Sequence, residues 1–203
     1  MNNLNNRVAI ITGSSRGIGK AIAKRLAQDG ATVAINYSQS ADKAEVVVKE
    51  ITQNGGKAIA LQADVSKIAD LERLFDQTIE QLGKVDILVN CAGVVVYKPL
   101  VEVSATDFDK IFAINVKGTY FACQQAAKKM ADNGRIINIS STTTAMMLPT
   151  YSAYVATKGA VEQISRVLAK EVGDRGITVN IVSPGPTDTP LCNLKDKMAL
   201  IES

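Results

Sequence analysis

The apolar positions along the chain fall into two alternating patterns. Short runs rich in β-branched residues predict buried strands at Val8–Ile11, Thr32–Asn36, Lys57–Gln62, Ile87–Asn90, Arg135–Ser140 and Thr178–Ser183. Longer segments between them carry apolar stripes at helical spacing, for example Leu71, Leu74, Phe75, Ile79 and Leu82. Apolar strands that alternate with helices predict an α/β fold: a doubly wound parallel sheet with helices on both faces, in three layers.

Two long helices are predicted in the second half of the chain. Ser104 and Asp107 form an N-terminal capping pair for a helix over about Ala105–Met130, and a second helix covers Ser152–Val172. No change in composition marks a boundary, so we expect one domain over residues 1–203, with 184–203 as a substrate-loop region.

Composition excludes several classes of function. The net charge is only +3 and no dense run of Lys or Arg occurs, so we expect neither a nucleic-acid partner nor an anionic membrane partner. The chain has no histidine and its three cysteines lack metal-ligand spacing, which argues against a metal site or a histidine triad. A polar start and the lack of a membrane-length apolar run predict a cytoplasmic protein.

A glycine-rich turn follows the first predicted strand. Thr12–Gly19 reads Thr-Gly-Ser-Ser-Arg-Gly-Ile-Gly and leads into an amphipathic helix. Glycines at a strand-to-helix turn let the backbone approach a pyrophosphate at the helix N-terminus. A simple turn is the alternative, but its place after the first strand favours a dinucleotide site. The expected contacts are Gly13, Ser15, Arg16, Gly17, Ile18 and Gly19.

The end of the second strand bears on the choice of nicotinamide cofactor. An acidic residue there would bind the ribose hydroxyls of NAD, but Tyr37 and Ser38 stand in its place. Arg16 in the glycine turn suits a 2′-phosphate, unless it is merely a solvated charge. We therefore predict NADP(H), with NAD(H) possible. Asp64 and Val65, after the third strand, are placed to flank the adenine.

Candidate chemistry lies in Tyr154, Lys158 and Ser141. An ammonium one helical turn from a phenol favours the phenolate and so suits the phenol to proton transfer at neutral pH. Ser141 could hold a substrate oxygen against that phenol. Taken alone, the Tyr-x-x-x-Lys spacing also fits a solvated helix face.

Together these segments resemble the short-chain dehydrogenase/reductase family, over about Arg7 to Thr189. Thr12–Gly19 is similar to its TGxxxGxG cofactor loop in a Rossmann fold, and Asn90-Cys91-Ala92-Gly93 to its NNAG segment. The remaining matches are Asn115, Ser141, Tyr154 with Lys158, and Pro184-Gly185 with Thr189. The resemblance implies further cofactor contacts from Asn90, Ala92, Gly93, Tyr154, Lys158, Pro184, Gly185, Thr187 and Thr189.

The resemblance also implies catalytic roles. Tyr154 would be the general acid in carbonyl reduction or the base in alcohol oxidation. Lys158 would activate it and hold the nicotinamide ribose, and Ser141 would orient the carbonyl. Asn115 would anchor a water that resupplies the proton through Lys158.

Two departures from the family pattern stand out. Cys91 replaces the second asparagine of NNAG and loses the hydrogen bonds of that amide, which puts local stability or cofactor fit in question. The chain also stops at Ser203, where members usually continue through a helix and a final strand. We therefore expect those two C-terminal elements to be missing.

The sequence also bears on the substrate and on the oligomeric state. Apolar segments that could line the pocket, without an evident fixed cation, are Val94–Tyr97, Met146–Leu148, Tyr151 and Pro186–Leu191. They favour a small, mostly apolar aldehyde or ketone, although Met146 and Met147 could equally be core residues. A 3-oxoacyl-[acyl-carrier-protein] reductase is the alternative, and a non-catalytic NADP(H)-sensing or scaffold protein a second one. Small residues on the two long helices, together with the family's habit, predict a homodimer or homotetramer.

Overall fold

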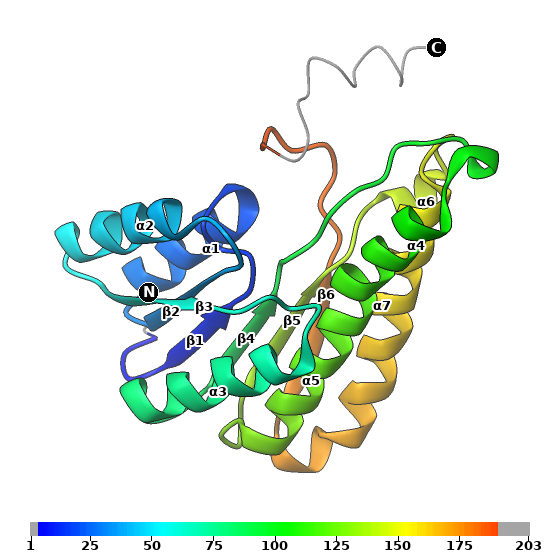
Figure 1. Cartoon of the computed structure of the whole chain (residues 1–203). Helices are drawn as coiled ribbons and strands as arrows, with labels where there is room; N and C mark the ends of the chain where they lie inside the picture. Colours follow the sequence, from blue (N-terminus) through cyan, green and yellow to red (C-terminus); the bar gives the residue numbers. More distant parts are fainter. Residues whose placement is uncertain (1–3, 191–203) are drawn as a thin grey trace.

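The computed structural model describes residues 4–190 and has a six-stranded sheet as its middle layer (Figure 1). The strand order is β3-β2-β1-β4-β5-β6, and every neighbouring pair is parallel. The strands are β1 (Val8–Ile11), β2 (Thr32–Tyr37), β3 (Lys57–Gln62), β4 (Ile87–Asn90), β5 (Arg135–Ile139) and β6 (Thr178–Val182). The predicted fold class is confirmed.

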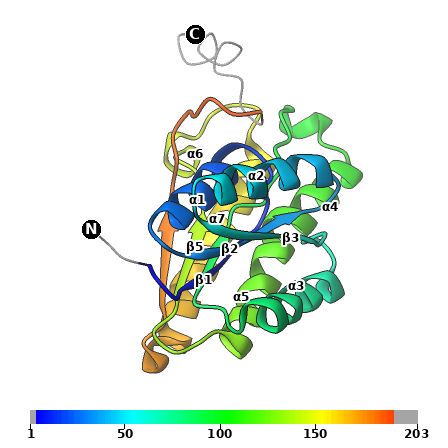
Figure 2. The same ribbon diagram turned by 90° about the vertical axis from the view of Figure 1, so that its left-hand side faces the viewer.

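Helices cover both faces of this sheet. The helices α1 (Gly17–Gln28) and α2 (Ala41–Gln53) lie on one face, and α3 (Ile68–Leu82), α5 (Gly118–Lys129) and α7 (Ser152–Glu171) lie on the other (Figures 1 and 2). Side chains of β1 alternate between the two layers: Ile10 packs with the α3 side, whereas Ala9 and Ile11 pack with the α1 side. This alternation explains why β1, with the sequence Val-Ala-Ile-Ile, is apolar at every position.

The helix predicted over Ala105–Met130 has a wider turn inside it. Its cap is as expected, because Ser104 and Asp107 each bond the other's backbone amide. The chain then runs through α4 (Ala105–Phe112), a π-helical turn η2 (Ala113–Lys117) and α5. The predicted helix is therefore present, and it contains a π-helical turn that was not predicted. Such π turns arise where a functional side chain is re-aimed, and Asn115 occupies this one.

The two edge strands differ from their prediction as buried elements, and in β3 only Leu61 is buried. β6 alternates between exposed and half-buried residues, and Val182 is 48% exposed. β6 is at the edge of the sheet formed by residues 4–190, with β5 as its neighbour. Three short helices were not predicted: η1 (Leu100–Glu102), α6 (Thr143–Met146) and η3 (Gly173–Arg175).

Strand order determines where a ligand can bind. The chain proceeds outward from β1 to β3 and then returns to place β4 on the other side of β1. Loops after β1 and β4 therefore run in opposite directions and open a crevice at the carboxyl ends of the strands. Within the described part of the chain, no helix is both long and apolar enough to cross a bilayer.

Candidate active site

A cavity of about 870 Å³ lies at this crevice. It is lined by the glycine turn and by loops that follow the other strands. Most of the predicted site residues line it: Gly13, Ser15, Arg16, Gly17, Ile18, Gly19, Tyr37, Ser38, Asp64, Val65, Ala92, Gly93, Ser141, Tyr154, Lys158, Pro184, Gly185, Thr187 and Thr189. The predicted substrate-loop region, residues 184–203, is described by the structure only as far as Pro190. Leu191 and the residues after it lie outside the described range.

The glycine turn has the geometry that a dinucleotide requires. Gly13 has a φ of +65°, and a Cβ there would lie 2.7 Å from the Ala92 Cα. A Cβ on Gly19 would lie 2.6 Å from the Gly13 carbonyl oxygen. Neither position tolerates a side chain, so the backbone itself lines the cavity where α1 begins. The residues present therefore fit a bound pyrophosphate.

Two buried polar side chains hold this turn in place. Asn36 Oδ1 accepts a 3.1 Å hydrogen bond from Gly13 N, and its amide donates to Ala63 O at 3.1 Å. Thr12 Oγ1 accepts from the backbone amides of Cys91 and Ala92, at 3.0 and 3.1 Å. Sequence reasoning missed Asn36, although a polar residue at the end of an apolar strand was a usable signal.

The wall beyond the turn bears on the adenosine end of a dinucleotide. Arg16 is exposed and lines the cavity together with Tyr37, Ser38 and Gln39. Asp64 is the one carboxylate among the described lining residues. Its Oδ1 accepts from the amide and the hydroxyl of Ser66, at 3.0 and 2.7 Å, which fixes the carboxylate at the cavity wall.

Lys158 is a buried cation. It is 7% exposed, and its Nζ donates a 2.7 Å hydrogen bond to the carbonyl of Ile139 at the end of β5. Burial lowers the pKa of Lys158 to about 8, opposed by a smaller electrostatic effect of Cys91. The ammonium also lies 5.6 Å from the centre of the Tyr154 ring. An ammonium held this close to the phenol stabilises negative charge on it.

Ser141 follows β5 and is oriented by Thr143. Its Oγ accepts from Thr143 N at 3.2 Å and lies 2.9 Å from Thr143 Oγ1. With Thr143 donating to the Ser141 oxygen, the Ser141 proton is available to a group in the cavity. Ser141, Tyr154 and Lys158 thus line one cavity together with the glycine turn.

The two asparagines of the predicted site lie behind the cavity wall. The side chain of Asn115 exchanges two 2.9 Å hydrogen bonds with the backbone of Val94, and its amide reaches Thr157 Oγ1 at 3.1 Å. The side chain of Asn90 bonds Asn138 Oδ1 at 2.8 Å. Asn115 therefore braces the loop after β4, whereas Asn90 ties β4 to β5. The contact of either side chain with substrate, water or cofactor stays a prediction.

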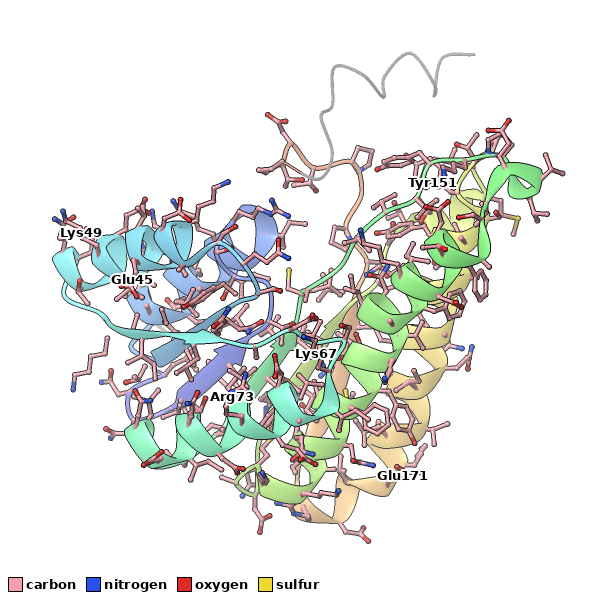
Figure 3. All side chains as sticks on the ribbon, in the orientation of Figure 1. Glu45, Lys49, Lys67, Arg73, Tyr151 and Glu171 are labelled. Carbon is pink, nitrogen blue, oxygen red and sulfur yellow. The ribbon has the colours of Figure 1, made fainter. Side chains whose placement is uncertain are left out.

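The cavity wall around Tyr154 contains further aromatic side chains. The ring of Tyr97 lies edge-on to Tyr151 with centroids 4.9 Å apart. Tyr151, which is labelled in Figure 3, lies edge-on to Tyr154 at 6.2 Å. Lys110 also lines the cavity, although the sequence had shown no fixed cation among the expected lining segments. Met146 also lines it, 46% exposed, whereas Met147 is 79% exposed. Neither methionine is a core residue.

Cys91 lines the cavity as a half-buried free thiol. Burial raises its pKa to about 11, a shift that the nearby Lys158 reduces. The local sheet remains tied together, since Cys91 N still donates to Thr12 Oγ1. Among residues 4–190, no group of three or more His, Cys, Asp or Glu side chains is placed to bind a metal.

The family model for short chain dehydrogenases matches residues 7–199. The chain belongs to the short-chain dehydrogenase/reductase family. An uncharacterised oxidoreductase of Methylorubrum extorquens is 48% identical over 185 residues, which cover 91% of this chain and 75% of that protein. A probable tetrahydroxynaphthalene reductase of Zymoseptoria tritici is 42% identical over 189 residues, covering 93% of this chain and 71% of that protein.

Solved structures agree with this membership. The crystal structure of a short-chain dehydrogenase from Burkholderia cenocepacia in complex with NADP is 42% identical, with a TM-score of 0.91. The match covers 94% of this chain and 78% of that one. The chain is thus an oxidoreductase of the short-chain dehydrogenase type.

Proposed function

We propose that this oxidoreductase transfers a hydride between NADP(H) and the carbonyl or alcohol carbon of an apolar aldehyde or ketone. One observation carries the proposal: a single cavity joins the glycine turn to Ser141, Tyr154 and Lys158. The turn suits a dinucleotide phosphate, and the three side chains suit proton transfer to an oxygen. A sensor or scaffold that had lost catalysis would not need these side chains together.

The proposed chemistry divides between cofactor and chain. NADPH, when bound, supplies the hydride. Ser141 donates a hydrogen bond to the substrate carbonyl and stabilises the charge that develops on its oxygen. Tyr154 gives that oxygen its proton, and Lys158 stabilises the phenolate that remains. In alcohol oxidation the same groups act in reverse.

Arg16 supports the preference for NADP(H). It is exposed at the cavity wall beside Tyr37 and Ser38, and no carboxylate follows β2 to repel a 2′-phosphate. The Burkholderia cenocepacia structure contains NADP, which is consistent with the same choice here.

An aromatic ketone is the proposed substrate class. The rings of Tyr97, Tyr151 and Tyr154 form a continuous edge-to-face series at the substrate end of the cavity. Such rings bind a flat aromatic substrate better than an aliphatic chain. The name of the Zymoseptoria tritici relative, a tetrahydroxynaphthalene reductase, supports the same class. Among the described residues, the cations that line the cavity are Arg16, Lys110 and the buried Lys158, which do not amount to the basic patch that an acyl-carrier protein would need.

A homodimer or homotetramer remains part of the proposal, as does a cytoplasmic location. Two of the small residues on the predicted long helices, Ala122 and Ala126 of α5, are fully buried within the subunit, so they cannot contact a second copy. The outward faces of α4, α5 and α7 instead expose Phe108, Tyr120 and Val167, at 45, 50 and 58%. Apolar side chains of this size on neighbouring helices favour contact with a second copy. Sedimentation of the protein as a monomer would refute this part.

The substrate panel tests the function as a whole. Purified protein is mixed with NADPH or NADH and with a bicyclic aromatic ketone, an aliphatic aldehyde or a 3-oxoacyl thioester. We expect the highest kcat/KM with NADPH and the aromatic ketone. A preference for NADH would refute the cofactor assignment, and a preference for the thioester would make the acyl reductase the better description.

A further inference from the structure

Glu162 lies one helical turn beyond Lys158 on α7 and contacts the segment that carries Ser141. Its Oε1 accepts a 2.8 Å hydrogen bond from Ser140 Oγ and lies 3.0 Å from Thr144 Oγ1. These two hydroxyls flank Ser141 in the sequence. We propose that Glu162 is a positioning residue: its carboxylate fixes the Ser141 segment against the helix that carries Tyr154. This role rests on the proposed function.

The segment around Ser141 has little of its own to keep it in place. Helix α6 (Thr143–Met146) is a single turn, which is too short to be stable without outside contacts. It ends at Met147, whose φ of +50° is unusual for a side chain of this kind. Met146 and Met147 are exposed, so burial of apolar surface contributes little there. The position of Ser141 therefore depends on hydrogen bonds at its flanks.

The backbone bonds of this segment lead toward β6 rather than toward α7. Ser140 N donates to Val182 O at 2.8 Å, and Thr142 N donates to Pro184 O at 3.1 Å. These bonds fix the segment to the sheet and to the loop that follows it. They do not set its distance from Tyr154, which belongs to α7.

Side chains of α7 reach the segment at two successive turns. Lys158 binds the Ile139 carbonyl, and Glu162 binds the hydroxyls of Ser140 and Thr144. The helix that carries the proposed acid thus also holds the residue that orients the carbonyl. An error of about 1 Å between two such groups can cost on the order of 100-fold in rate.

A carboxylate suits this position for a specific reason. Hydroxyl bonds to an ionised oxygen are stronger than bonds between neutral groups. The hydroxyl of Thr144 also lies 3.0 Å from Ser141 O, so its one proton is shared between this carbonyl and the carboxylate. Ser140 is 2% exposed, and its hydroxyl would lose its bond to the carboxylate if Glu162 were removed.

Matched variants of Glu162 separate positioning from charge. Both bonds end on one oxygen, so Glu162→Gln keeps an acceptor in place, whereas Glu162→Ala removes it. We expect Glu162→Ala to lower kcat roughly 10- to 100-fold, with the KM for NADPH changed by less than about twofold. Glu162→Gln should stay within about threefold of the wild type, since an amide oxygen accepts two hydrogen bonds. Glu171→Ala, an exposed change at the end of the same helix, is the control (Figure 3).

Amide hydrogen exchange tests the positioning role of Glu162 without measuring enzyme activity. We expect Glu162→Ala to speed amide exchange in residues 141–150 while leaving the glycine turn unchanged. Thr144→Val, which removes one of the two hydroxyls, should give a smaller change of the same kind, and it takes the place of Glu162→Ala if that variant does not fold. Wild-type protein that reduces no ketone would refute the proposed function. The hydrogen-exchange measurement would still test whether Glu162 holds the Ser141 segment in place. Unchanged exchange, an unchanged kcat, or a Gln variant as slow as the Ala variant would overturn the role of Glu162.

Discussion

The ammonium of Lys158 lies 5.6 Å from the centre of the Tyr154 ring and donates a hydrogen bond to the Ile139 carbonyl. One buried cation thus connects α7, which carries the proposed acid, to the end of β5, where the Ser141 segment begins. Its position follows from the fold, since β5 and α7 meet at the carboxyl edge of the sheet. Burial disfavours the charged form of this lysine and so lowers its pKa.

The lowered pKa of Lys158 predicts that the stability of the protein depends on pH. The pKa of Lys158 is about 8 in the folded protein and near its ordinary value of 10.5 in the unfolded chain. Between these values the unfolded chain binds more protons, so the free energy of unfolding should rise with pH through this window. The rise totals on the order of 3 kcal/mol. Denaturant unfolding at several pH values measures it.

The control for this prediction is a second lysine variant. Lys158→Met should lose the rise, whereas Lys128→Met, on the exposed side of α5, should keep it. A Lys158→Met protein with the wild-type pH profile would show that the buried ammonium is not its source.

Arg16 should determine the preference for NADPH. An arginine that binds a 2′-phosphate contributes a charge-assisted bond, so Arg16→Ala should raise the KM for NADPH about 10- to 100-fold. The KM for NADH, which lacks this phosphate, should change less than about threefold. Arg166→Ala, an exposed change on α7, serves as the control. Equal losses with both cofactors would contradict a contact with the phosphate.

Tyr97 should discriminate between substrates. Its ring supports Tyr151 at 4.9 Å, so Tyr97→Ala removes one end of the aromatic wall. A ring contact is worth about 1 kcal/mol, and kcat/KM for a bicyclic ketone should therefore fall roughly five- to tenfold. The value for a small aliphatic aldehyde should change less than about twofold, and Tyr97→Phe, which keeps the ring, should lose less kcat/KM for the bicyclic ketone than Tyr97→Ala. Parallel losses for both substrates would count against an aromatic site.

Asp86 should matter for stability far from the cavity. Burial would raise the pKa of this carboxyl, but hydrogen bonds from Val8 N, Arg7 and Lys84 outweigh it and lower the pKa. A lowered pKa means that its contribution is present above about pH 4 and is lost as the pH falls through the folded-state value. Asp86→Ala should cost about 2–4 kcal/mol at neutral pH. Asp132→Ala, which breaks an exposed pair with Arg175, should cost less than about 1 kcal/mol. Equal losses of unfolding free energy in the two variants would contradict this account.

The strands were predictable because packing against helices on both faces makes most of their positions apolar, as in β1 and β4. β1, β3 and β4 have the predicted bounds, and the other three strands differ by one residue. The resemblance to short-chain dehydrogenases is confirmed by the family match, and the cavity gathers most of the residues that it implied.

What the sequence did not reveal depends on side chains meeting across the fold. The π turn contains Asn115, whose side-chain amide bonds the backbone of Val94 in a distant segment. Asn36 supports Gly13, and Glu162 binds Ser140, again across elements that no periodicity connects. The predicted burial of β6 was wrong because a strand at the edge of a sheet has the same apolar residues as a central one.

Turnover by Tyr154→Phe tests the central claim most directly. The variant loses one oxygen atom and keeps the ring that packs on Tyr151. NADPH oxidation with a bicyclic aromatic ketone should fall by roughly 1000-fold or more, since the proton donor is gone. NADPH affinity, measured by calorimetry, should stay within about threefold of the wild type. A variant that binds NADPH and still reduces the ketone at the wild-type rate would contradict the account.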